Sequence, residues 1–155
     1  MLPEIQLFLT TRAQSRTIIQ EKDESALLNI PVGLANNMLW IFGHLIRTTD
    51  FLILKQAGQP MLFPTELDSL FAKGSSPTNW PIMSGLKQKL FDAEEICQKS
   101  VLEFLEKADL NKKFENPYTT SSGYVLDSVM AALRYNLVHE AIHLGQLQIY
   151  KKLVN

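Results

Sequence analysis

The sequence predicts an all-α protein, a four-helix bundle in which a long connection with one short helix separates the second and third helices. Four long segments repeat their apolar residues every three or four positions, which is the spacing of one face of a helix. Glycine and proline residues lie at the ends of these segments. We find no useful run of alternating apolar and polar residues, so no strand is expected.

Each periodic segment would form a helix roughly 30–45 Å long, at about 1.5 Å per residue. Pro3 stands near the start of the first helix, where a missing N–H costs nothing. Gly58 and Pro60 end the second helix. Packing the helices side by side would bury their apolar faces. The predicted helices comprise residues 3–22, 32–57, 79–108 and 123–153.

Two connections complete the predicted fold. Residues 60–78 contain a short helix that begins at Pro64 and Thr65 and ends before Gly74. Residues 109–123 are polar and are expected to form a loop. With 155 residues, the chain is expected to fold as a single domain over its whole length, residues 1–155.

Composition and charge exclude several classes of function. Hydrophobic residues make up 46% of the chain and the formal net charge is −1, so we expect no nucleic-acid partner. The sequence has neither a basic, apolar signal at its start nor a stretch of about 20 apolar residues, so a cytoplasmic protein without a membrane partner is expected. The single cysteine, Cys97, excludes an internal disulfide and is interpreted as a buried structural thiol.

The chain has three histidines, and their positions suggest a metal site. His139 and His143 are four residues apart in a predicted helix, so they share one face. Two imidazoles on such a face can bind one ion at about 2.0–2.1 Å each. His44 lies in the most apolar part of the second predicted helix, where a buried ring needs a partner.

The segment "HEAIH" also matches the H-E-x-x-H pattern of zinc proteases, with Glu140 in the position of the general base. We reject that interpretation because no strand is predicted to hold an extended peptide. In addition, the helical step of about 100° per residue turns Glu140 away from the face of the two histidines. We therefore assign no catalytic residue.

A polar line on the last predicted helix accompanies the histidines, formed by Asn136, His139, His143, Gln146 and Tyr150. A polar stripe that points into a helical bundle needs partners. A bound cation and a hydrogen-bond network without metal both meet that need, and the residue spacing leaves both interpretations open.

The pairing of "WIFGHLIRTTDF" with "HEAIHLGQLQIYKKL" resembles the DinB-like superfamily. The resemblance implies a four-helix bundle, often dimeric, with a three-histidine metal site. Carried over by position, the ligands are His44, His139 and His143. The "HLGQ" segment also corresponds, so Gly145 would allow a close helix approach and Gln146 would lie near the metal.

The resemblance also implies a class of chemistry. Some relatives are metal-dependent thiol transferases, so we expect thiol S-transfer, or a related hydrolysis or isomerisation, on a small electrophile. Trp40, Arg47 and Tyr135 are the expected pocket residues, with Arg47 steering an anionic group. Expected partners are a divalent ion, with zinc or nickel favoured, a small-molecule thiol or electrophile, and a second copy in a homodimer. The alternative is a non-catalytic metal-binding or dimerisation module.

Overall fold

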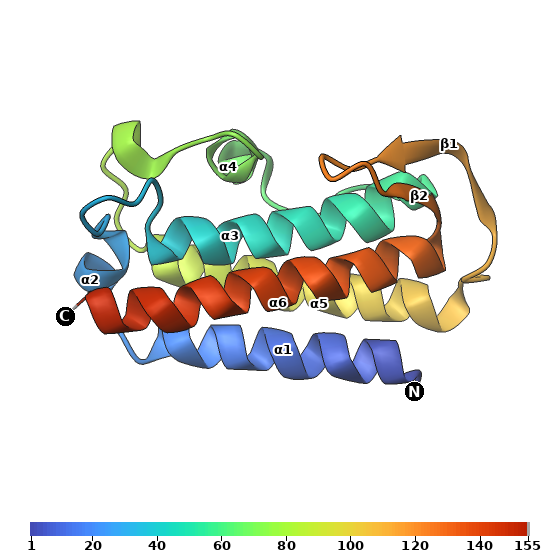
Figure 1. Ribbon diagram of the computed structural model, residues 1–155, viewed down its shortest axis with the longest axis horizontal. Coiled ribbons are helices and arrows are strands. Elements are labelled where there is room, and N and C mark those ends of the chain that lie inside the picture. Colours follow the sequence, from blue (N-terminus) through green and yellow to red (C-terminus); the bar gives the residue numbers. More distant parts are fainter. Residues whose placement is uncertain (155) are drawn as a thin grey trace.

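The computed structural model describes residues 1–154 and is mainly helical, with one small antiparallel sheet (Figure 1). The four longest helices lie side by side; the first and last run in one direction and the middle two in the other (Figure 1). The predicted all-α class is therefore correct for most of the chain. These helices are α1 (Pro3–Gln20), α3 (Met38–Thr49), α5 (Leu86–Lys107) and α6 (Val129–Leu153).

The ends of the second predicted helix show how local residues set its limits. It begins at Met38 rather than at residue 32, because the Asn37 side chain accepts a hydrogen bond from the Trp40 backbone N–H at 2.7 Å and caps the helix. It stops as predicted before Gly58, whose φ of +75° is left-handed. Between α3 and that glycine the helix widens and then tightens, through η1 (Asp50–Leu54, π-type) and η2 (Lys55–Ala57, 3-10).

The third and fourth predicted helices also begin later than expected. The third begins at Leu86, after Gly85 with φ +70°, and the 3-10 turn η3 (Pro77–Asn79) lies before it. The fourth begins at Val129, because the Ser128 hydroxyl caps it by accepting from the Ala131 N–H at 3.2 Å. The short helix of the connection is present as α4 (Thr65–Phe71), and a further short helix, α2 (Glu24–Leu28), was not predicted.

The loop predicted for residues 109–123 is wrong in part, because a hairpin forms there. β1 (Lys113–Thr119) pairs antiparallel with β2 (Val125–Ser128), and its register is irregular between Lys113 and Tyr118. That irregularity tolerates Pro117, which argues against a strand in the sequence. The strand-free expectation is therefore also wrong.

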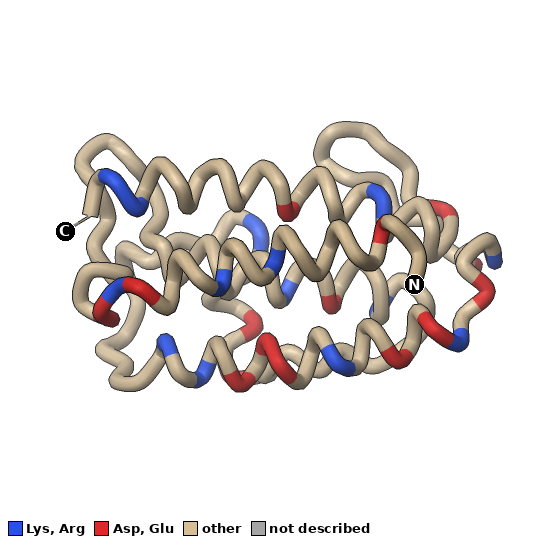
Figure 2. The backbone as a smooth tube through the Cα atoms, turned by 90° about the horizontal axis from the view of Figure 1, so that it is seen from below, with Lys and Arg blue, Asp and Glu red and all other residues tan. Residues whose placement is uncertain are grey.

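Charged residues are distributed over the molecule. Lys and Arg are interspersed with Asp and Glu along the backbone of residues 1–154 (Figure 2).

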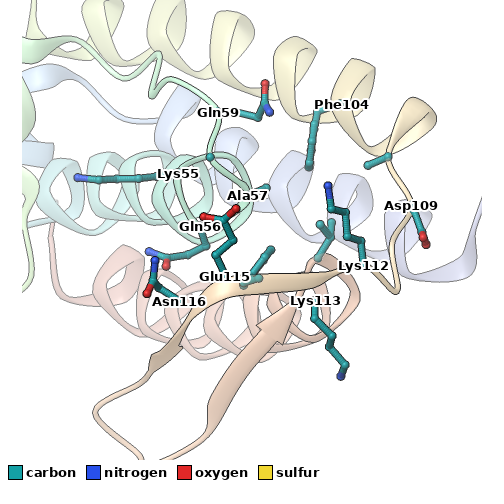
Figure 3. Close-up of a pocket in the computed structure, with 14 residues that line it drawn as sticks. Lys55, Gln56, Ala57, Gln59, Phe104, Asp109, Lys112, Lys113, Glu115 and Asn116 are labelled. Atoms are coloured by element: carbon teal, nitrogen blue, oxygen red, sulfur yellow. The ribbon is translucent and has the colours of Figure 1, made fainter.

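A cavity of about 540 Å³ lies where η2, the end of α5 and β1 meet, and it is lined by residues that include Lys112 and Phe104 (Figure 3). Within residues 1–154, no helix combines the length and the apolar character needed to cross a membrane.

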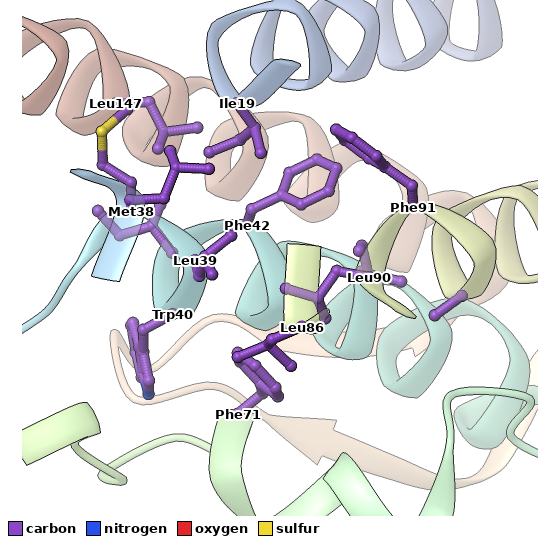
Figure 4. Close-up of a cluster of buried hydrophobic side chains, with 14 of the residues drawn as sticks. Ile19, Met38, Leu39, Trp40, Phe42, Phe71, Leu86, Leu90, Phe91 and Leu147 are labelled. Atoms are coloured by element: carbon purple, nitrogen blue, oxygen red, sulfur yellow. The ribbon is translucent and has the colours of Figure 1, made fainter. Parts of the chain in front are cut away.

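The apolar core holds α3 in place. Almost every side chain of this helix is buried, and Phe42 meets Phe91 of α5 edge to face with ring centroids 5.8 Å apart (Figure 4). Cys97 of α5 is also buried, which raises the pKa of its thiol to about 12 and confirms the predicted structural thiol. Because α3 is packed on several sides, the polar residues it carries have fixed positions.

Candidate metal centre

The three histidines lie together in the structure. α3 provides His44, and α6 provides His139 and His143; a nitrogen of each lies within 4.8 Å of the others. The Nε2 atom of His139 is 3.3 Å from Nε2 of His44 and 3.1 Å from Nε2 of His143. Two ligand nitrogens on one tetrahedral ion at about 2.0–2.1 Å would be separated by about 3.3 Å. The spacing of the rings therefore fits a single ion.

Neighbouring acceptors set the tautomers of two of the rings. His44 Nδ1 lies 2.8 Å from the Phe71 carbonyl, which can only accept, so Nδ1 carries the hydrogen. His143 Nδ1 lies 2.7 Å from Oε1 of Gln146 and donates to it in the same way. Both rings then present the bare Nε2 toward His139, which is the arrangement of a metal-binding histidine with a partner on its other nitrogen.

The three histidine rings remain uncharged at neutral pH. Burial, followed by the nearby His143 and His44, lowers the pKa of His139 to about 2. Burial also lowers the pKa of His44 to about 4 and lowers that of His143. At neutral pH the three rings are therefore uncharged, and His44 and His143 direct lone pairs at Nε2 of His139, an arrangement that a shared cation would stabilise. These three residues fit a divalent metal ion.

A close helix contact positions His44. A Cβ atom on Gly43 would lie 2.4 Å from the Phe71 ring, so glycine is what lets α4 approach α3. The same approach brings the Phe71 carbonyl to His44. The Trp40 ring stacks on His44 with centroids 4.7 Å apart and an angle of 10°, and its Nε1 donates to Ser75. Trp40 therefore supports the ring of His44.

A cavity of about 320 Å³ opens beside the histidines. Of the pocket residues predicted from the sequence, Arg47 and Tyr135 line it, whereas Trp40 and Gln146 act on the histidine rings instead. Arg47 forms a two-point ion pair with Asp68 of α4, at 2.9 and 3.2 Å. The cavity is lined by His44, Arg47, Thr48, Phe51, Leu52, Ala72, Lys73, Tyr118, Thr120, Ser121, Tyr135 and His139.

Glu140 faces away from the histidines, as its helical position predicts. It is fully buried and accepts hydrogen bonds from both Nε and Nη2 of Arg12 of α1. Thr49 also donates to Glu140, at 3.0 Å, and lies within reach of Asn136. Glu140 is thus a structural partner of Arg12 and is not available as a general base at this site.

Sequence reasoning missed Arg12 and misplaced the important glycine. Arg12 lies on the buried face of α1 with Phe8 and Ile19, and a lone arginine in that apolar stripe was the available signal. The close helix approach expected at Gly145 is wrong, because a Cβ there would meet nothing within 4 Å. The approach occurs at Gly43.

The fold and the histidine cluster together define a mainly helical protein with a candidate three-histidine metal site. A family model described as the DinB superfamily matches residues 7–147, so the chain belongs to the DinB superfamily, as the sequence motifs predicted. Its fold is similar to that of the crystal structure of a conserved protein from Enterococcus faecalis. That comparison has a TM-score of 0.70 and 13% identity over 97% of this chain and 94% of the other, a likeness in fold alone. A search of curated proteins gave no match.

Proposed function

We propose that this DinB superfamily protein, with its four long helices arranged as a bundle, binds one divalent metal ion through His44, His139 and His143. The observation that supports the proposal most strongly is the convergence of the Nε2 atoms at 3.1 and 3.3 Å. The hydrogen bonds that His44 and His143 make through Nδ1 add support, because they leave Nε2 bare. Zinc and nickel are the ions we favour, since both accept imidazole.

We further propose metal-dependent thiol S-transfer to a small electrophile. A divalent ion bound by three neutral imidazoles lowers the pKa of a thiol or a water molecule that binds beside them. Three protein ligands leave room for that additional group. The cavity beside His44 and His139 supports the assignment, because it gives the reactants a place next to the site.

In the proposed reaction the thiol loses its proton to solvent and its sulfur attacks the electrophilic carbon. The new S–C bond forms as the leaving group departs with the bonding electron pair. The walls of the cavity, including Phe51 and Tyr135, would orient the electrophile and reduce its contact with water. A related hydrolysis would use water in place of the thiol, and an isomerisation would return the sulfur as the leaving group.

Turnover by the zinc-loaded protein, prepared without a histidine tag, tests this proposal. The assay would combine a panel of cysteine-derived thiols with a fluorogenic alkyl halide. We expect turnover that a chelator removes, that added zinc restores, and that His139→Ala abolishes. Absence of metal-dependent turnover with every thiol of the panel would contradict the catalytic proposal.

A non-catalytic metal-binding or dimerisation module is the second candidate. α6 presents an exposed apolar row of Val138, Ile142, Ile149 and Leu153, each at least 53% exposed in the single chain. These residues lie at helical spacing, and such a row is typical of a surface that another protein covers. Light scattering should then give the mass of a homodimer, and Ile142→Glu should give a monomer that still binds metal.

A further inference from the structure

The cavity beside the histidines has an uneven charge. Within residues 1–154, none of the side chains that line it is acidic, whereas two are basic. Asp68 neutralises one of these, Arg47, through both guanidinium contacts. The other, Lys73, is exposed and makes no ion pair or side-chain hydrogen bond in the described part of the chain. Lys73 is therefore the uncompensated positive charge of the cavity.

The lining of the cavity also offers neutral hydrogen-bond donors. It comes from the β1–β2 hairpin, which contributes Tyr118, Thr120 and Ser121. The Thr120 hydroxyl is engaged, since it accepts from the Tyr124 N–H and contacts Ser122. The hydroxyls of Tyr118 and Ser121 have no hydrogen-bond partner within residues 1–154, so they are free to contact a ligand.

We propose that this cavity selects a small anionic ligand, whose carboxylate or similar group lies against Lys73 and the hydroxyls of the hairpin. The inference rests on the proposed function, because the other end of the ligand, a thiol, would reach the histidines. Three neutral imidazoles add no negative charge to the site. The bound ion and Lys73 would therefore both give the cavity a positive potential. Lys73 is thus a specificity-determining residue. Arg47 is a second cation of the cavity, and its charge is neutralised by the ion pair with Asp68.

The size and shape of the cavity indicate how large the ligand is and where its anionic group would lie. A cavity of about 320 Å³ is at the small end of the range for ligand sites, so it suits a short thiol acid rather than a peptide. The ring of Tyr118 packs edge to face on Phe51, with centroids 5.3 Å apart, and both residues line the cavity. An anionic group is then directed toward the exposed edge at Lys73.

Binding of three thiols that differ in charge tests the proposal. Tag-free protein loaded with cobalt(II) would be titrated with mercaptopropionate, mercaptopropanol and cysteamine. Binding would be followed by the thiolate-to-cobalt absorption band and, in parallel, by calorimetry. Comparing each variant with the wild type cancels the intrinsic differences among the thiols. Lys73→Ala should weaken mercaptopropionate about fivefold and leave mercaptopropanol unchanged, as expected for one exposed charge pair.

Two further variants complete the test. One should strengthen binding of the anionic thiol, and the other is a control that should have no effect. Asp68→Asn should release Arg47 and strengthen mercaptopropionate several-fold. Lys112→Ala should change nothing, because this exposed lysine lines the separate cavity where η2, the end of α5 and β1 meet (Figure 3). Added salt should reduce the preference for the anion.

The outcomes separate this inference from the proposed function. If mercaptopropanol and mercaptopropionate both give the cobalt band and Lys73→Ala weakens them equally or not at all, the anion site is wrong and the thiol site stands. If no thiol gives the band, thiolate binding is wrong. Calorimetry then decides the anion site alone, which a Lys73-independent heat of binding or no binding would overturn.

Discussion

Two polar clusters meet at adjacent residues of α6, and they satisfy their buried groups in different ways. Glu140 belongs to the first cluster, where Arg12 and Thr49 supply its partners from α1 and α3. His139 belongs to the second, where the nearest polar atoms are the Nε2 atoms of two other histidines. Both carboxylate oxygens of Glu140 therefore accept hydrogen bonds from other residues of the chain. The second cluster directs the lone pairs of two histidines at Nε2 of a third, beside a cavity, and leaves His139 Nδ1 buried without a hydrogen-bond partner within residues 1–154. We therefore propose that its partner is a cation.

The largest effect should come from breaking the first cluster. Glu140→Leu leaves the Arg12 guanidinium buried without its carboxylate, so we expect a loss of about 3–5 kcal/mol in the free energy of unfolding. Urea unfolding of the metal-free protein measures it. Arg12→Met combined with Glu140→Leu should recover much of the loss. A single variant as stable as the wild type would contradict the structural role of this pair.

His139→Ala should instead reduce zinc affinity and leave the fold intact. Removing one ligand of three should weaken zinc binding by more than about a hundredfold, since even changes next to ligands cost about 10–100-fold. Competition with a chromogenic chelator measures the affinity. The metal-free variant should remain folded by circular dichroism, with Gln148→Ala of the same helix as a control. Unchanged zinc affinity in a folded His139→Ala protein would argue against the site.

The two helix glycines give a matched pair that isolates the support of His44. Gly43→Ala forces Phe71 away, so it should lower stability by about 1–3 kcal/mol and weaken zinc binding through the lost carbonyl contact. Gly145→Ala meets open space and should raise stability by up to about 1 kcal/mol without changing zinc affinity. Differential scanning calorimetry and zinc titration of both variants check this. Similar behaviour of the two would refute the proposed contact.

The smallest effect, expressed per pH unit, is the pH dependence of the stability of the metal-free protein. The pKa of His44 falls from 6.5 to about 4 on folding, so the unfolded chain binds a proton there before the native state does. Stability should therefore decline as the pH falls from 6.5 toward 4, on the order of one kcal/mol per pH unit. Urea midpoints measured across that range test the slope. His44→Gln should make it shallower, and an unchanged slope would contradict the burial of a neutral ring.

The difference between the two clusters also explains what could be predicted from the sequence. His139 and His143 follow from their spacing, and the orientation of Glu140 follows from the helical step. The spacing alone did not link these two histidines to His44, and that link came from the resemblance of the two motifs to the DinB-like superfamily. Local signals of this kind lie within a few residues of one another, so a single sequence reveals them.

What sequence reasoning missed depends on the packing of distant elements. The carbonyl of Phe71 has no signature in the sequence, because its role arises only when α4 docks at Gly43. The pairing of Arg12 was missed for the same reason, because its partner lies on another helix. The hairpin was missed because Pro117 and a polar composition hide β1, which is held by pairing with β2.

Elemental analysis of tag-free protein tests the central claim most directly. The protein would be incubated with excess zinc, dialysed extensively, and measured alongside His139→Ala treated in the same way. We predict one zinc ion per wild-type chain and almost none in the variant. No retained metal in the folded wild type, or equal metal in both proteins, would contradict a three-histidine site.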